Sequence, residues 1–474
     1  MKTIVNNNQT NLEALNFINE VIKGSKFENH VYCMEGCARD FYLGEDIYSI
    51  NLCVDLYNGC NEFAKFLIEK DGSLKEHNPL CYDDERYAYA TLYNIKGADD
   101  AVLIEIETME KDNESYSNKK HELASIKEHA LTKAFTIDAL YVNISNGDIY
   151  DPLGYAKHDI NNKLIRTSIN ADELFEKNPE KMLNAIQSAC DNNYSIEKST
   201  WFSIIKNANK LSSNKKIDLE IEFELAATSN KFSTYLRYML RSGLLQYIMP
   251  HVYSLTMVKK TDEYDTDMFE HTLQVIDKCP IESDIQFAAL FHDTGKYQVE
   301  KTNEFGFVTH YNHEALSGRI AYETLKNLGF SDITAKRVKN IVELHGRFMN
   351  KSDVSPSLKT LKTLKSDAGD NLEAVFKLME ANNLSRNEKY QKPKQVSIAR
   401  DLIEKIEKRE SLLATRKILP INGKDLMDRF NLKPSQTIGV VFSKVNDAFK
   451  KNINMSKEDC FKVAENELKK LNAI

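Results

Sequence analysis

The sequence predicts an α+β protein in which a mixed α/β head is followed by a mostly α-helical body. Strand-forming and helical patterns alternate through residues 1–165, whereas from about residue 170 the apolar residues recur at helical spacing, most clearly over 218–249. In addition, 474 residues exceed what one hydrophobic core usually organises, so we expect about two to four domains.

The strands expected in the head are short stretches rich in β-branched and aromatic residues. They are HVYCMEGC (30–37), YSINLCVDLY (48–57), AYATLYNI (88–95), AVLIEIETM (101–109) and FTIDALYVNI (135–144). The last of them ends at Ser-Asn-Gly-Asp, which is a turn sequence. This order predicts a mixed α/β head.

Three polar or charged segments mark the expected domain boundaries, at 151–163, 258–267 and 387–395. Together with the change of pattern near residue 170, they divide the chain into a head, a helical neck, a histidine-containing domain and a helical tail. The expected ranges are 1–165, 166–260, 261–395 and 396–474.

The composition is that of an ordinary globular protein. Apolar residues make up 42% and charged residues 28% of the chain, and no stretch approaches the roughly 18 consecutive apolar residues of a membrane span. The N-terminal stretch, MKTIVNNNQTNLEALNF, lacks the apolar core of a signal peptide, so we expect a cytoplasmic protein with no membrane contact. The eight cysteines form no CxxC pair, which suits reduced thiols better than disulfides or a zinc finger.

The net charge of −7 hides an asymmetry along the chain. Residues 331–474 hold 29 Lys and Arg against 19 Asp and Glu, a balance of +10, which leaves −17 for residues 1–330. A basic C-terminal third suits contact with the phosphates of a nucleic acid, so the charge permits such a partner without demanding one. The alternative is that these charges are solvated helix faces.

Two adjacent side chains able to bind a metal follow a strongly apolar helix. IQFAALFHDTGK (285–296) ends that helix at His292 and Asp293, with Gly295 supplying the break, and the preceding helix in DMFEHTLQVIDKC (267–279) carries His271. Imidazole and carboxylate ligands together suit Mn, Fe, Ni, Co or Zn. Such an ion would polarise a phosphoryl oxygen and acidify a water.

Three further residues accompany the pair. Lys296 follows directly and is placed to hold a phosphate, while His313 lies in HYNHEALSG (310–318) and His345 in VELHGRF (342–348). We expect all the named histidines to converge on one cleft. The alternative, a capping or surface pair at residues 292–293, leaves these companions unexplained.

The order of these residues resembles that of the HD-domain metal-dependent phosphohydrolases. The resembling residues are His271, the run FHDTGK (291–296), His313-Glu314 and His345. The resemblance implies a divalent ion, Mn, Ni, Co, Fe or Mg, held by His271, His292 and Asp293. It makes His313 and His345 further ligands or phosphate contacts.

One position departs from the HD pattern. Members of that family close the metal site with an aspartate on a late helix, where VFKLMEANNLSRN (375–387) has Asn382. An amide carbonyl coordinates a metal without charge, so we expect weaker affinity. The resemblance further implies catalytic roles for Lys296, which would stabilise charge, and for Asp293, which would bind the metal or orient the attacking water.

The rest of the chain resembles the CCA-adding tRNA nucleotidyltransferases and poly(A) polymerases. The resembling segments, in the family's order, are VYCMEGCARDFYLGEDIYSINLCV (31–54), FTIDALYVNISNGDIYDPLGYAKHDINNKLIR (135–166), NPEKMLNAIQSAC (178–190) and LPINGKDLMDRFNLKPSQTIG (419–439). The resemblance implies a nucleotidyltransferase-like head, a neck that binds nucleotide or RNA, and a tail that contacts tRNA.

The polymerase chemistry of that family needs two carboxylates one residue apart on a strand, which hold two Mg²⁺ ions. The matching positions here are Ser49 and Asn51, and neither is anionic. Glu105 or Glu107 would be a third carboxylate, but one acid is a poor cage for two dications. Magnesium binding and phosphoryl transfer in the head are therefore doubtful.

Other head motifs are weakened in the same direction. The glycine pair that lets the backbone approach a triphosphate has become Glu35-Gly36, which places a negative charge beside a polyanion. Arg39 and Asp40 persist and are interpreted as supports of the turn after the first strand. Lys133 stands where the family has an arginine.

The helix that selects the incoming base in that family is altered as well. Asn178 and Lys181 replace the aspartate and arginine that read CTP or ATP, and Asn184 replaces a further arginine. Because lysine lacks the planar fork of arginine, paired hydrogen bonds to a base edge would be lost. Any nucleotide or RNA binding by these head and neck residues is expected to be weak.

Two functions from different classes remain open. The first is a metal-dependent phosphohydrolase that acts on nucleotide or RNA-end phosphate esters such as 2′,3′-cyclic phosphates. The second is a catalytically silent protein that binds tRNA or another structured RNA. Residual CCA or poly(A) transfer is a third possibility. The sequence leaves the oligomeric state open.

Overall fold

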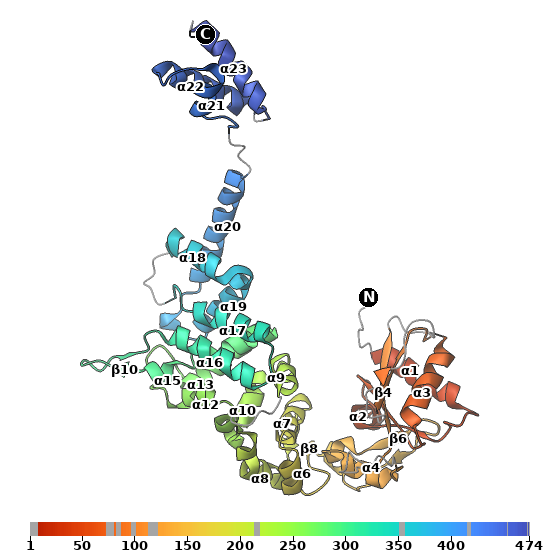
Figure 1. Ribbon diagram of the computed structural model, residues 1–474. Helices are drawn as coiled ribbons and strands as arrows, with labels where there is room; N and C mark the ends of the chain where they lie inside the picture. Colours follow the sequence, from red (N-terminus) through yellow and green to blue (C-terminus); the bar gives the residue numbers. More distant parts are fainter. Residues whose placement is uncertain are drawn as a thin grey trace. The chain divides into compact units, whose positions relative to one another are not determined.

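The computed structural model describes residues 8–72, 80–81, 87–95, 101–111, 122–212, 219–349, 356–414, 419–452, 454–471 and 473 (Figure 1). By their internal contacts the residues form two compact units. The first comprises Met1–Asn350 with Ala368–Lys392, and the second comprises Lys351–Asp367 with Pro393–Ile474. The four-domain division of the sequence stays a prediction.

The head is built on a seven-stranded sheet, which confirms the expected mixed α/β fold. Its order is β3 (Leu80–Cys81), β4 (Tyr87–Leu92), β5 (Val102–Thr108), β2 (Ile50–Val54), β1 (Val31–Cys33), β6 (Tyr141–Asn143) and β7 (Ile149–Tyr150). Strands β2 and β5 pair in parallel, and the other neighbours pair antiparallel. Four of the five predicted stretches contain one of these strands, and the stretch 88–95 overlaps β4, which begins one residue earlier.

Helices surround this sheet. They are α1 (Asn8–Ile22), α2 (Glu35–Leu43), α3 (Gly59–Asp71), α4 (Ile126–Thr132) and α5 (Ala156–Asn161). Helix α2 follows β1 almost at once and ends at Gly44, whose φ of 69° is the left-handed conformation that glycine adopts without strain. At the other end of α2, Glu35 has a φ of 54°.

The neck is helical apart from one small parallel pair, β8 (Leu164–Ile165) with β9 (Ser195–Ile196). Its helices are α6 (Ala171–Lys177), α7 (Lys181–Asp191), α8 (Lys198–Asn207), α9 (Glu220–Ala227), α10 (Phe232–Ser242), α11 (Leu244–Ile248) and α12 (Pro250–Tyr253). This agrees with the predicted loss of strand signals after residue 170.

Helix α14 (Ser283–Phe291) is the core of the histidine-containing region. Every residue from Ile285 to Phe291 is buried, because α14 is packed by helices on several sides. These are α13 (Met268–Lys278), α16 (His313–Asn327), α17 (Asp332–Leu344) and α19 (Leu372–Leu384). A short helix, α15 (Lys296–Val299), and the hairpin of β10 (Lys301–Thr302) and β11 (Val308–Thr309) connect α14 to α16.

The second unit is helical throughout its described part. Its helices are α18 (Leu358–Ala368), whose last residue already belongs to the first unit, α20 (Gln395–Ala414), α21 (Gly423–Phe430), α22 (Gln436–Lys451) and α23 (Lys457–Lys470). A compact apolar core that includes Leu426, Val441, Val445 and Leu468 joins α21, α22 and α23. Across the described residues, every helix is too short or too polar to cross a lipid bilayer.

Candidate metal centre and head cavity

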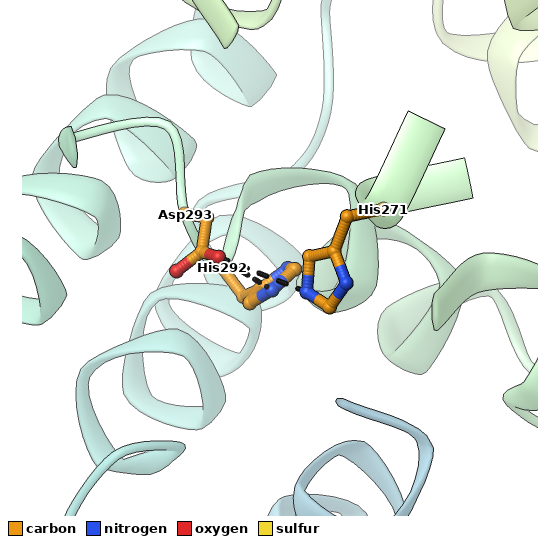
Figure 2. Close-up of side chains that lie close together, drawn as sticks. All are labelled: His271, His292 and Asp293. Atoms are coloured by element: carbon orange, nitrogen blue, oxygen red, sulfur yellow. Dashed lines mark ion pairs between the residues drawn. The ribbon is translucent and has the colours of Figure 1, made fainter. Parts of the chain in front are cut away.

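Asp293 is the centre of the histidine cluster. It lies in the turn directly after α14 and is 1% exposed. The four predicted histidines all direct Nε2 toward its carboxylate. The Nε2 to oxygen distances are 4.0 Å for His271, 3.1 Å for His292, 3.1 Å for His313 and 3.8 Å for His345. Figure 2 shows three members of the cluster, and the structure thus brings together the side chains that the sequence predicted to converge.

Each histidine stands at a defined place on its helix. His271 lies inside α13, whereas His292 directly follows α14, His313 begins α16 and His345 directly follows α17. Gly295 has a φ of −78°, so it does not end α14 through a left-handed turn. Its role is space instead, since a Cβ at Gly295 would lie 2.7 Å from the backbone oxygen of His313.

Backbone carbonyls fix the orientation of all four rings. Nδ1 lies 3.2 Å from Ser385 O in His271, 2.7 Å from Ala289 O in His292, 2.9 Å from His310 O in His313 and 2.6 Å from Val342 O in His345. A carbonyl oxygen only accepts, so Nδ1 donates in each ring and Nε2 presents a lone pair to the centre. This is the arrangement by which proteins orient metal-binding imidazoles.

The protonation states of the cluster follow from burial and charge. Burial, followed by the neighbouring His292, lowers the pKa of His271 to about 3. Burial also holds the pKa of His345 well below its usual range. For Asp293, burial alone would raise the pKa, but His292 and Lys296 outweigh it and hold the pKa well below the ordinary value. His271 and His345 are therefore neutral imidazoles beside an ionised carboxylate.

Several atoms suited to coordinate a metal have no hydrogen-bond partner in the part of the protein that the structure describes. Within the described residues, Nε2 of His271, Nε2 of His292 and Oδ1 of Asn382 are buried and accept no hydrogen bond. Asn382 lies three residues before Ser385, the residue that follows α19 and whose carbonyl accepts the hydrogen bond from His271 Nδ1, so both residues are on the same side of the helix end. Imidazole lone pairs with carboxylate and amide oxygens form a donor set that fits a divalent ion of the Mn to Ni series.

Lys296 extends the centre, and Tyr264 is a neighbour that the sequence did not indicate. The Lys296 ammonium lies 2.8 Å from Asp293 Oδ2 and donates to the Tyr264 hydroxyl at 3.0 Å. The ring of Tyr264 also packs on that of His271, with 4.3 Å between the centroids. Tyr264 falls in the charged segment 258–267, which reads as a linker in the sequence, so no local pattern singles it out.

A second candidate site is a cavity of about 730 Å³ between the head sheet and the neck. Among the predicted head and neck residues, Gly36, Arg39, Lys133 and Lys181 line it. Three others do not line the cavity, namely Asp40, Glu105 and Asn178. Asp40 is 8% exposed, with 3.7 Å from the Arg39 Nε to its Oδ1, and burial raises its pKa. The structural role of the Arg39-Asp40 pair stays a prediction.

Hydrogen bonds within the protein engage Ser49 and Asn51, the two positions at which the family's carboxylates are expected from the sequence. Ser49 donates to Asn51 Oδ1 at 2.7 Å, and Asn51 donates to Glu105 Oε2 at 3.1 Å across the parallel β2–β5 pair. Burial, and then the charge of Glu35, raises the pKa of Glu105. Glu105, the one carboxylate among these three residues, thus already accepts a hydrogen bond from the Asn51 amide.

Glu107, which lines the cavity, is held by two basic side chains. Its carboxylate lies 2.6 Å from the Lys133 ammonium and 3.2 Å from His129 Nε2. Lys133 also contacts Glu35 at 3.0 Å. Burial would raise the pKa of Glu107, but His129 and Lys133 outweigh burial and lower the pKa to about 2. Burial would likewise lower the pKa of Lys133, and Glu35 and Glu107 raise it instead.

Comparisons with known proteins agree with the two sites. Residues 31–166 match the poly A polymerase head domain, and residues 268–387 match the HD domain. The CCA-adding enzyme of Bacillus velezensis is 23% identical over 241 residues, which cover 50% of this chain and 55% of that protein. The tRNA nucleotidyltransferase cca1 of Schizosaccharomyces pombe is 27% identical over 198 residues, which cover 39% of this chain and 38% of that protein.

The chain is a homologue of the CCA-adding enzymes. The matched part spans about half the length of the first curated relative and less of the second. Among solved structures, the Bacillus stearothermophilus CCA-adding enzyme in complex with CTP has a TM-score of 0.54 at 16% identity, covering 98% of this chain and 99% of that one. A CCA-adding enzyme in apo form II has a TM-score of 0.55 at 17% identity, with 95% of each chain covered.

This homologue of the CCA-adding enzymes therefore shares their head and body fold. The HD domain contains the complete cluster of histidines around Asp293. In the poly A polymerase head, positions 49 and 51 are occupied by the uncharged Ser49 and Asn51.

Proposed function

We propose that the HD domain is a metal-dependent phosphohydrolase that acts on nucleotide or RNA-end phosphate esters, and that the head no longer transfers nucleotides. The observation that carries this proposal is the set of four Nε2 atoms directed at one buried carboxylate. Among the described residues, Nε2 of His271 and Nε2 of His292 are buried without a hydrogen-bond partner, which is costly unless a ligand occupies the centre.

The residues of the centre have distinct roles in this reaction. His271, His292 and Asp293 hold the metal, with Asn382 and the other two histidines as further ligands or phosphate contacts. A bound divalent ion supplies Lewis acidity and an acidified water. Lys296, whose ammonium is fixed between Asp293 and Tyr264, stabilises the charge that develops on the phosphoryl oxygens.

The head argument rests on charge. A triphosphate with two Mg²⁺ ions needs anionic ligands that are available for metals, whereas Glu107 is held by Lys133 and His129 and Glu105 by Asn51. Glu35 adds a negative charge to the cavity. A double variant, Ser49→Asp with Asn51→Asp, introduces two carboxylates at these positions. We expect it to leave the incorporation of CTP and ATP into tRNA undetectable. Incorporation by the unmodified protein would instead support residual transfer.

The test is release of phosphomonoester from 2′,3′-cyclic AMP with Mn²⁺, Ni²⁺ or Mg²⁺ supplied in turn. We expect metal-dependent turnover by the native protein and none by the His292→Ala, Asp293→Ala double variant. Asp293→Asn, which keeps the side-chain volume, covers the case in which the double variant fails to fold. His158→Ala, at an exposed histidine of the head, is the control and is expected to retain activity.

The second candidate function is binding of tRNA or another structured RNA without turnover. The relatives named CCA-adding enzyme and tRNA nucleotidyltransferase and the +10 balance of residues 331–474 favour it. Absence of turnover with all three metals, together with tRNA binding that weakens as salt is raised, would support this function over hydrolysis.

A further inference from the structure

Tyr264 contacts two residues of the metal centre through different parts of its side chain. Its hydroxyl accepts a hydrogen bond from the Lys296 ammonium at 3.0 Å, and its ring packs on the imidazole of His271 with 4.3 Å between the centroids. The ammonium also lies 4.8 Å from the centre of the Tyr264 ring, which is within the range of a cation–π contact. This buried tyrosine therefore joins a candidate metal ligand to the cation beside it.

The loop that carries Tyr264 is anchored on both sides of the residue. Asn387 donates from its backbone N–H to the backbone oxygen of Glu263 at 2.9 Å. The side-chain amide of Asn387 donates to Asp265 Oδ1 at 2.6 Å. Asn387 lies just beyond the end of α19, where a backbone carbonyl orients the ring of His271. The same stretch of chain thus fixes both Tyr264 and the imidazole on which it packs.

His271 needs a second support more than the other three imidazoles of the centre do. The distance from its Nδ1 to a backbone carbonyl is 3.2 Å, whereas this distance is 2.6 to 2.9 Å in the other rings. Its Nε2 atom is also the farthest of the four from the Asp293 carboxylate, at 4.0 Å. Contacts behind a metal-binding imidazole fix its orientation and raise metal affinity. The ring of Tyr264 supplies such a contact.

The Tyr264 hydroxyl helps to determine where the Lys296 ammonium lies. Among the described residues, the ammonium has two oxygen partners, Asp293 Oδ2 at 2.8 Å and the hydroxyl at 3.0 Å. Its third neighbour is the Met268 sulfur at 3.8 Å, and a thioether is a weak acceptor. Without the hydroxyl, the ammonium would turn wholly toward the carboxylate, because that is then the strongest attraction on it.

We propose that Tyr264 is a positioning residue of the phosphohydrolase centre, whose hydroxyl acts through Lys296 and whose ring acts through His271. The hydroxyl holds the ammonium where it stabilises charge on the phosphoryl oxygens. The ring holds the imidazole in the orientation that binds the metal. This inference rests on the proposed phosphohydrolase function and adds a residue to its centre. The two parts of the side chain therefore have separable effects, one on turnover and one on metal affinity.

The hydroxyl is tested with Tyr264→Phe, which keeps the ring. We expect kcat for 2′,3′-cyclic AMP to fall by about tenfold and KM to stay within about twofold, because a hydrogen bond to a charged group that acts in the transition state is lost. In a Lys296→Met background the same substitution should lower kcat by less than about twofold, since the group through which the hydroxyl acts is absent. A tenfold loss in both backgrounds, or no loss in the native one, would overturn the action through Lys296.

The ring is tested with Tyr264→Leu by titrating the metal-free protein with Ni²⁺, which needs no turnover. We expect affinity to fall by about tenfold to a hundredfold in Tyr264→Leu and to stay within about twofold of native in Tyr264→Phe. Tyr264→Met, which fills more of the space without a ring, covers the case in which Tyr264→Leu fails to fold. Equal Ni²⁺ affinity of native protein and the variant without the ring would overturn the action through His271.

Tyr235→Phe is the matched control for both measurements. Tyr235 is 1% exposed and lies on α10 in the neck, so its substitution should leave kcat and Ni²⁺ affinity unchanged. If the native protein has no turnover with any metal, the phosphohydrolase function fails and the role of the Tyr264 hydroxyl fails with it. The Ni²⁺ titration then decides the role of the ring by itself. Turnover by native protein that is equal in Tyr264→Phe would instead refute the hydroxyl's role and leave the phosphohydrolase function standing.

Discussion

The metal centre and the head cavity both contain buried charged groups, but they differ in whether the buried polar atoms have partners within the protein. Around Asp293, Nε2 of two histidines and Oδ1 of Asn382 find no hydrogen-bond partner among the described residues. In the head, by contrast, Lys133 bridges Glu35 and Glu107, and Asn51 engages Glu105. Buried lone pairs without a partner, as at the metal centre, indicate a place for a ligand. A network in which every carboxylate already has a partner, as in the head, indicates a structural role.

The difference has an energetic cause. A buried ion pair is stable only when each charge is compensated, and Lys133 compensates Glu107 from within the chain. Such a pair competes with any external cation. At the metal centre Lys296 compensates only part of the cluster, because its ammonium approaches Oδ2 of Asp293 while the imidazole lone pairs of His271 and His292 remain unused.

The largest expected effect is loss of metal on removing the charge at Asp293. Asp293→Asn keeps the shape but not the anion on which four Nε2 atoms converge. We expect the metal content after dialysis to fall from about one ion per chain to near zero, and turnover to fall by about 100-fold or more. Elemental analysis and the 2′,3′-cyclic AMP assay measure these. Asp284→Asn, on the helix α14 that precedes Asp293 and paired with Arg337 at 3.0 Å, should keep its metal, and full metal occupancy in Asp293→Asn would contradict the assignment.

The next largest effect concerns the head. Lys133→Met leaves Glu107 with its charge only partly compensated, and should lower the free energy of unfolding by about 3–4 kcal/mol. Lys26→Met, which breaks the exposed pair with Glu62, should cost less than about 1 kcal/mol. Urea unfolding measures both. Equal losses in the two variants would show that the Lys133 network does not stabilise the head.

The loss in Lys133→Met should also depend on pH. The pKa of Glu107 is lowered to about 2 in the folded protein, so its pairing stabilises the fold fully above the ordinary glutamate pKa of about 4.3. That contribution disappears as the pH falls toward 2. The difference between native protein and Lys133→Met is therefore expected to be constant near neutral pH and to shrink between about pH 4 and pH 2.

A smaller effect of opposite sign is expected at Asp138, which also lines the head cavity. Burial, and then the charge of Glu35, raises its pKa to about 7. The folded state therefore holds a proton that the unfolded state releases above about pH 4, and stability falls as the pH rises from 4 to 7. Asp138→Asn should remove this trend and gain on the order of 2 kcal/mol over the native protein between pH 5 and pH 8. An unchanged pH dependence of stability in Asp138→Asn would argue against the raised pKa of Asp138. Asp148→Asn, at an exposed turn, is the control.

The sequence predicts which histidines belong to the metal centre because three of them stand at helix ends and His271 stands inside the helix before them, which leaves a local signal. It also predicts the fold, since strand-like and helix-like spacing separate the head from the body. Partners far apart in the chain carry no such signal. Ser385 orients His271 from 114 positions away, and Tyr264 contacts Lys296 across 32.

The sequence also gives no sign of places where two backbone segments lie in close contact. Gly295 reads as a helix breaker, yet its φ is ordinary and the reason for glycine is the backbone of His313 at 2.7 Å from any added Cβ. In the head the sequence indicates the loss of charge at Ser49 and Asn51. It does not indicate that Lys133 joins Glu35 to Glu107. These contacts form only because folding places β5, α2 and Lys133 along the same cavity.

The smallest expected effect tests whether the head still has the backbone of a glycine site. Glu35 has a φ of 54°, a conformation that costs a residue with a side chain about 1 kcal/mol and glycine almost nothing. Glu35→Gly and Glu35→Ala both lose the contact with Lys133, so the difference between them isolates the backbone. We expect the glycine variant to be more stable by about 1 kcal/mol in urea unfolding. An alanine variant of equal or greater stability would mean that the left-handed turn imposes no strain. The predicted order would instead show that the backbone at position 35 favours glycine, so that Glu35 contacts Lys133 from a strained conformation.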